Sequence, residues 1–149
     1  DKKVRVVLQA GKVADSVGNL NSAVAVLVRN YDGTAPTLDF ATPTVSGTAG
    51  TDNDSKGTFV INVNNGGASD VLATKFDKTK IIAIGGTIDS VTPTTSGSPL
   101  KVTAVTVVVT FPRGPGNSVT LQALPGVVTD VSGNKNVLST GVLLTPGAG

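Results

Sequence analysis

The fold is decided by residues 126–136, GVVTDVSGNKN, because the same pattern stands near the start of the chain as residues 11–21, GKVADSVGNLN. The Asp, the second Gly and both Asn of the first copy return 115 positions later. An apolar stretch precedes each copy, VVLQA at 6–10 and VTLQA at 119–123, and we expect an inserted Leu-Pro pair at 124–125 in the second copy. A tail that repeats the head in this way predicts one whole module preceded by the last third of another, as in a slice of a tandem array.

The composition predicts an all-β protein with an aliphatic core. The 149 residues include 24 Val and 20 Thr but only 4 Phe and 1 Tyr, and β-branched residues favour strands. The 18 Gly and 8 Pro are spread along the chain, as expected where many short strands alternate with turns. The length suits one ordinary domain and part of a second.

The absent residue types argue against catalysis. The chain has no Cys, His, Met, Trp or Glu, and all ten acidic residues are Asp. Nucleophilic triads and soft-metal sites therefore lack their usual side chains, and no spacing singles out a catalytic pair of carboxylates. We expect the protein not to be an enzyme.

Charge and hydropathy exclude further classes of partner. The net charge of +2 is spread without a basic stripe, so we expect no nucleic-acid partner. No apolar run approaches the roughly 20 residues needed to span a bilayer. The start of the chain shows no leader-like apolar region, so for an exported protein we expect the leader to have been removed or to lie outside this chain.

Strand patterns and turn residues predict two domains. Residues 4–9 and 23–29 form a hairpin, and residues 30–37, NYDGTAPT, break all periodicity, so we place the domains at 1–33 and 34–149. Further strands are predicted at 57–63, 71–76, 80–84, 101–111, 118–123 and 140–145, and no helix. In the first of these, Phe59, Ile61 and Val63 alternate and should face the core.

The repeated loop has two interpretations. Asp and Asn side chains pin turns by bonding nearby backbone amides, which makes the pattern a structural turn. The same oxygen-bearing side chains are ligands that Ca²⁺ prefers, which makes a calcium site the alternative. The candidate ligands are Asp15, Asn19, Asp32, Asp130 and Asn134.

Two other surface features have functional interpretations. Asn53 begins an Asn-Asp-Ser sequence, which fits the acceptor pattern for N-glycosylation. Tyr31, Phe111 and Arg113 are the residues nearest in type to a ligand-binding patch on loops.

The segment from 126 to 136 resembles the final hairpin of bacterial Ig-like modules, which occur in surface-layer proteins, large adhesins and other exported repeat proteins. In those modules an apolar strand leads into an Asp-x-x-Gly-Asn loop, and a Thr-Ala-Pro-Thr junction, matched here at 34–37, commonly opens the next domain. The resemblance covers residues 4–40 and 118–145. It implies an Ig-like Greek-key β-sandwich that acts as a spacer, adhesive or lattice unit.

The N-terminal hairpin should need a partner, because an isolated two-stranded hairpin is at best marginally stable. Three partners are open: upstream chain, the sheet of its own module, or the edge of a neighbouring copy. The apolar residues of this expected assembly interface are Val4, Val6, Leu8, Val24, Val26 and Val28.

The function expected from these features is that of a non-enzymatic extracellular structural module. It would stack in tandem or self-assemble, as in a surface layer, a filament or an adhesin stalk, with copies of itself or adjacent modules as partners. The alternatives are an Ig-like adhesive domain that binds glycan or a host surface, and a virion decoration or tail domain.

Overall fold

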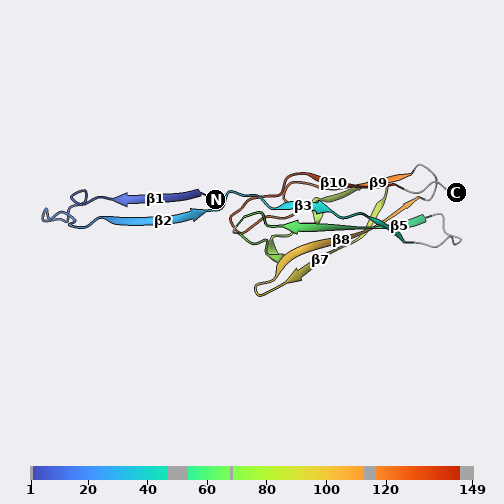
Figure 1. Cartoon of the computed structure of the whole chain (residues 1–149), viewed down its shortest axis with the longest axis horizontal. Coiled ribbons are helices and arrows are strands. Elements are labelled where there is room, and N and C mark those ends of the chain that lie inside the picture. Colours follow the sequence, from blue (N-terminus) through green and yellow to red (C-terminus); the bar gives the residue numbers. More distant parts are fainter. Residues whose placement is uncertain (1, 47–53, 68, 113–116, 145–149) are drawn as a thin grey trace. The chain divides into compact units, whose positions relative to one another are not determined.

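The computed structural model describes residues 2–46, 54–67, 69–112 and 117–144. The chain divides into two compact units, Asp1–Gly33 (unit 1) and Thr34–Gly149 (unit 2). Unit 1 is a hairpin in which β1 (Lys2–Leu8) pairs antiparallel with β2 (Ala25–Tyr31) (Figure 1). The long connection between these strands carries the first copy of the repeated loop.

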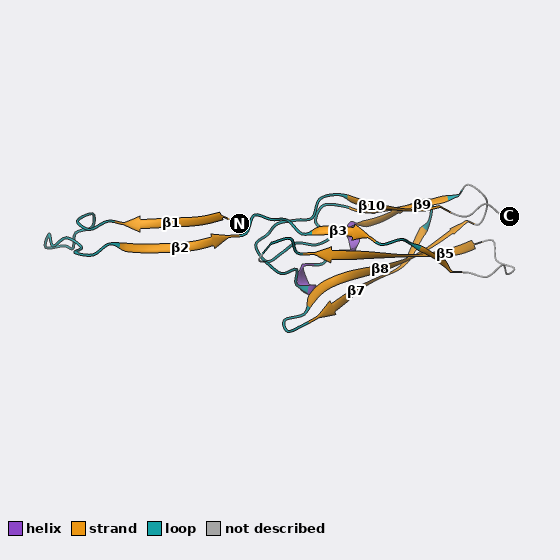
Figure 2. Cartoon of the chain, viewed as in Figure 1, coloured by secondary structure: helices purple, strands orange, loops and turns teal. Residues whose placement is uncertain are grey.

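Unit 2 is built from antiparallel strands in two sheets (Figure 2). The larger sheet has the order β3-β5-β8-β7, with β4 also paired to β5, and the smaller has the order β10-β9-β6. The larger sheet contains β3 (Thr37–Phe40), β4 (Thr44–Ser46), β5 (Asp54–Asn64), β7 (Thr87–Ser96) and β8 (Lys101–Pro112). The smaller contains β6 (Ile81–Ile84), β9 (Ser118–Ala123) and β10 (Ser139–Leu144). The prediction of an all-β chain with a separate N-terminal hairpin is confirmed.

One hydrophobic core takes side chains from both sheets. Alternate residues of β8, from Val105 to Phe111, are buried with Phe59 and Ile61 of β5, as the strand period of two requires. Val119 and Leu121 of β9 belong to the same cluster. Of the three residues predicted to face inward from β5, Val63 is partly buried and packs against this core.

Two glycines let bulky side chains close the core. A Cβ on Gly141 of β10 would lie 2.7 and 2.9 Å from two ring atoms of Phe40, nearer than real Cβ atoms approach. A Cβ on Gly57 of β5 would lie 2.5 Å from Leu143. The ring of Phe40 also meets Phe59 edge-on, with centroids 6.4 Å apart. The sheets are therefore fitted together where a side chain on one faces a glycine on the other.

The segment between β5 and β6 corrects one predicted strand. Residues 71–76 do not form a regular strand: they contain a 3₁₀ turn at Ala73–Lys75 and isolated bridges at Leu72 and Phe76, and a second 3₁₀ turn follows at Lys78–Lys80. Apolar side chains recur in this segment because its two ends pack against the core. They do not reflect continuous pairing with a neighbouring strand. No helix in the described part of the chain is long and apolar enough to cross a membrane.

Strand β7 was not predicted, and it carries a bulge. Its pairing with β8 skips Asp89 between Ile88 and Ser90, and further along it includes Pro93. The Asp89 carboxylate accepts hydrogen bonds from Thr110 Oγ1 at 2.6 Å and from Lys56 Nζ at 3.2 Å. The bonds to Thr110 and then to Lys56 hold the pKa of Asp89 below its ordinary value. The extra residue of the bulge thus ties three neighbouring strands together.

Replacing Gly141 with Ala should destabilise unit 2 by about 1–3 kcal/mol, because the new methyl group must displace the Phe40 ring. Urea denaturation of the full chain measures this. Val142→Ala is the control, since Val142 is exposed on the other face of β10 and its truncation should cost less. Equal losses in the two variants would contradict the close fit.

Replacing Asp89 with Asn should lower the melting temperature of unit 2 slightly at neutral pH. Because the pKa of Asp89 is lowered in the folded state, its contribution is present above the unfolded pKa and is lost as the pH falls through the folded pKa. The difference between the wild type and Asp89→Asn should therefore shrink as the pH falls below about 4. Melting curves across the acid range measure this, and a difference independent of pH would show that the charge has no part in it.

Candidate assembly interface

The two copies of the repeated loop have the same hydrogen-bonded structure. In the first, Asp15 Oδ1 accepts from Asn19 N at 2.9 Å and Oδ2 accepts from Asn19 Nδ2 at 3.0 Å. In the second, Asp130 accepts the equivalent bonds from Asn134, both at 2.8 Å. The glycine of each loop has a positive φ, 91° at Gly18 and 92° at Gly133, which explains why Gly returns there.

The last Asn of each copy fastens the loop to its strands. The side-chain oxygen of Asn21 accepts from two backbone amides, of Lys12 and Val13, and that of Asn136 accepts from Gly126 and Val128. The side-chain nitrogen of Asn21 donates to Gln9 O at 3.0 Å, and that of Asn136 to Leu124 O at 3.0 Å. The structural interpretation of the motif therefore accounts for its recurring Asp, its second Gly and both of its Asn residues.

These contacts correct the alignment of the two copies. Gln9 and Leu124 have the same role, and β1 and β9 each end three residues before the loop glycine, Gly11 or Gly126. The Leu-Pro pair at 124–125 is therefore equivalent to Gln9 and Ala10, and is not an insertion. The identical Leu-Gln-Ala sequences at 8–10 and 121–123 gave the wrong alignment. The error was not evident from the pattern because a shift of two residues along a strand leaves the face of each side chain unchanged. The second half of the hairpin differs by one residue, since Leu8 pairs with Ala25 whereas its equivalent Ala123 pairs with Ser139.

The copies differ in what covers them. In unit 2 the inward face of β9 and the loop beyond it are buried: Val119, Leu121 and Val128 have no exposed surface, and Asn136 has 1%. In unit 1 the equivalent Val6 is 58% exposed and Val13 is 51% exposed. Unit 1 thus repeats the hairpin and loop of β9 and β10, but the face that is buried in unit 2 is exposed in unit 1.

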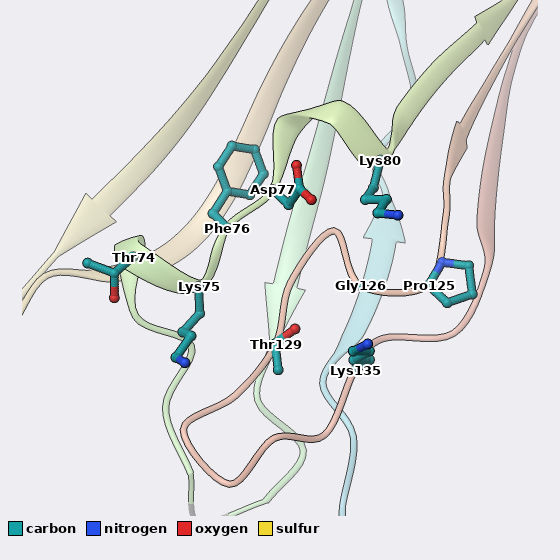
Figure 3. Close-up of a pocket in the computed structure, with 9 residues that line it drawn as sticks. All are labelled: Thr74, Lys75, Phe76, Asp77, Lys80, Pro125, Gly126, Thr129 and Lys135. Carbon is teal, nitrogen blue, oxygen red and sulfur yellow. The ribbon is translucent and has the colours of Figure 1, made fainter.

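In unit 2 the second loop is held by main-chain hydrogen bonds to the segment before β6. Val127 O accepts from Asp77 N at 2.8 Å, Thr129 N donates to Lys75 O at 3.2 Å, and Leu124 N donates to Lys80 O at 2.9 Å. Figure 3 shows the hollow left along this seam, between the two 3₁₀ turns and the loop. In the described part of the chain, the equivalent Lys12 O, Ala14 N and Gln9 N make no such bonds.

Within the described ranges, one edge of strand β1 is also unpaired, whereas both edges of its counterpart β9 are paired. Strand β9 pairs with β10 on one side and β6 on the other, with Ala83 opposite Leu121. Among the described residues β1 pairs with β2 alone, so its other edge has no neighbouring strand. The described residues of unit 1 therefore include no counterpart of β6 or of the segment that precedes it.

The six predicted interface residues divide between two faces of the hairpin. Val4, Val6 and Leu8 lie on one face, which the register shows also carries Leu27. Val26 and Val28 lie on the opposite face with Val7, and Val24 precedes β2. Leu27 was missed because the register that places it opposite Val6 depends on the loop length, which the sequence alone did not fix.

Only one of these faces is a core face in unit 2. Its equivalents there are Val119, Leu121 and Ala123, all buried. The opposite face of β9 and β10 is solvent-facing and carries Gln122, Thr140 and Val142. We therefore define the hairpin core face as Val4, Val6, Leu8 and Leu27, all of them exposed.

The geometry of the loops favours a turn over a calcium site. The Asp15 carboxylate also accepts from Val17 N at 3.0 Å, so N–H groups face both of its oxygens. These bonds, first of all that from the Asn19 side chain, hold the pKa of Asp15 below its ordinary value. Asn19 and Asn134 turn their amide nitrogens, not their oxygens, to the carboxylates. Asp32 is buried, and no group of three acidic side chains that could hold a metal occurs among the described residues.

The remaining candidate residues are placed as follows. Phe111 is 1% exposed and belongs to the core, so it is not available to a ligand, whereas Tyr31 is exposed. Asn53 and Arg113 lie outside the described residues.

Comparison of the chain with protein-family models, with curated proteins and with solved structures finds no match.

Replacing Asn136 with Ala should destabilise unit 2 by about 2–3 kcal/mol, because a buried amide, a partly buried amide and a partly buried carbonyl lose their partner. Asn21→Ala is the matched control: it removes the same bonds from unit 1 and should leave the transition of unit 2 unchanged. Urea denaturation of both full-length variants measures this. A comparable shift of that transition in Asn21→Ala would contradict the division into two units.

Proposed function

We propose that the chain is a non-enzymatic extracellular structural module that stacks in tandem or self-assembles, as in a surface layer, filament or adhesin stalk. The observation that carries this proposal is the repeated hairpin, whose loop bonds are the same in both units while its core face is buried in one and open in the other. A chain that holds one module and the closing hairpin of another has the order of a tandem array.

The arrangement of unit 2 supports an Ig-like Greek-key β-sandwich. The chain passes from one sheet to the other between β5 and β6, between β6 and β7, and between β8 and β9. Such crossings between antiparallel sheets around one core are typical of Ig-like modules. Modules of this kind commonly serve as spacers, and neither sheet needs a ligand to complete its core.

The hairpin core face supports a role in linking units. Four apolar side chains and an open strand edge lie together on unit 1, and exposed strand edges pair readily with other chains. The adhesive alternative loses one of its three aromatic or charged candidates, because Phe111 is in the core.

Light scattering of the full chain over a range of concentrations tests the linking role. Without its completing partner, the exposed core face should draw copies together, so the apparent mass should rise with concentration. Val6→Lys should abolish this rise because Val6 stands at the centre of that face, opposite Leu27.

Val7→Lys is the matched control, since Val7 is the next residue on β1 and points to the opposite face. It should associate like the wild type. A chain of constant mass, or equal effects of the two substitutions, would contradict a linking role for this face.

A further inference from the structure

The equivalence of the two hairpins shows, residue by residue, what a partner of unit 1 must accommodate. We call the part of unit 2 that covers β9, β10 and their loop the socket. It consists of β3, β5 and β8 with their core side chains, the residue 70–80 segment and β6. If a second copy of the chain were the partner, its socket would have to accept the hairpin of unit 1 in place of its own.

The socket has no room for Leu27. Val6 pairs with Leu27 in unit 1, and the equivalent Leu121 pairs with Gly141 in unit 2. The Phe40 ring lies against Gly141 so closely that even one added methyl group would displace it. A leucine at this place requires a much smaller residue where unit 2 has Phe40.

Two charged residues also fall at buried places. Val4 pairs with Arg29, whereas the equivalent Val119 pairs with Leu143, which is buried against Gly57. Lys12 has the position of Val127, which has no exposed surface. Burying these charges is costly unless carboxylates face them.

Resting on the proposed function, we infer that the partner of the hairpin core face is a β-sandwich module different from unit 2. Its socket has a small residue opposite Leu27 and acidic side chains near Arg29 and Lys12. It supplies a β6-like strand to the open edge of β1 and main-chain partners for Lys12 O and Ala14 N. Insertion of the hairpin into the socket of another copy of unit 2 is excluded by the same three residues.

A graft tests this inference in the full chain. Residues 118–144 are replaced by the sequence of residues 3–30, which puts the hairpin of unit 1 into the socket of unit 2. A second graft carries Lys12→Val, Leu27→Gly and Arg29→Leu, the residues that unit 2 has at these places, and every graft carries Leu8→Ala to match the buried Ala123. The first graft should lose the cooperative thermal transition of unit 2, and the second should recover it.

Phe40→Ala provides a test of opposite sign. In the natural chain it should lower the melting temperature, because Phe40 packs against Phe59 and covers Gly141. In a graft that keeps Leu27 but carries Lys12→Val and Arg29→Leu, it should raise the melting temperature by making room for the leucine.

Equal stability of the two grafts, whether both fold or both fail to fold, would overturn the inference, and so would a Phe40→Ala effect of the same sign in both backgrounds. Either of these two outcomes would leave the proposed structural function standing, with a second copy of the chain as an acceptable partner. Failure of the proposed function would instead appear in the light-scattering comparison of Val6→Lys with Val7→Lys.

Discussion

The bond between an aspartate and the asparagine four residues after it is the constraint from which the rest of this structure can be understood. Asp15 with Asn19, and Asp130 with Asn134, close a loop whose shape is independent of its surroundings, since it is the same when exposed and when buried. The loop and the length of chain that follows it set the register between the two strands, which differs by one residue between the two copies. The register in turn decides which side chains share a face, and so which residues need cover.

Much of the fold could be predicted because the strand pattern of the sequence agreed with the burial of the same residues in the core. Valine-rich alternation gave the long strand β8, and Phe59 and Ile61 faced the core as expected. Prediction failed where tertiary contacts decide the backbone. The apolar side chains within residues 71–76 pack against the core although the segment forms no regular strand, and β7 is poor in apolar residues because one of its edges and much of its surface face solvent.

The interface could be predicted in outline but not in detail. The repeat located the hairpin, yet the shared Leu-Gln-Ala letters suggested an alignment two residues away from the structural one. Sequence identity cannot reveal such a shift, because it preserves the alternation of faces. Leu27 and Arg29 became informative only once the strand pairing showed that they hold the positions of Gly141 and Leu143 in the other hairpin.

Strand β7 forms one edge of the larger sheet, and its bulge at Asp89 and its Pro93 interrupt the regular row of main-chain groups that an added strand would need. Natural proteins use both devices against unwanted pairing at sheet edges. Sheet extension at the β7 edge is thereby discouraged, while the edge of β1 has neither a bulge nor a proline. Strand pairing is thus hindered at the β7 edge and open at the β1 edge, an asymmetry that agrees with the proposed linking of modules through the hairpin.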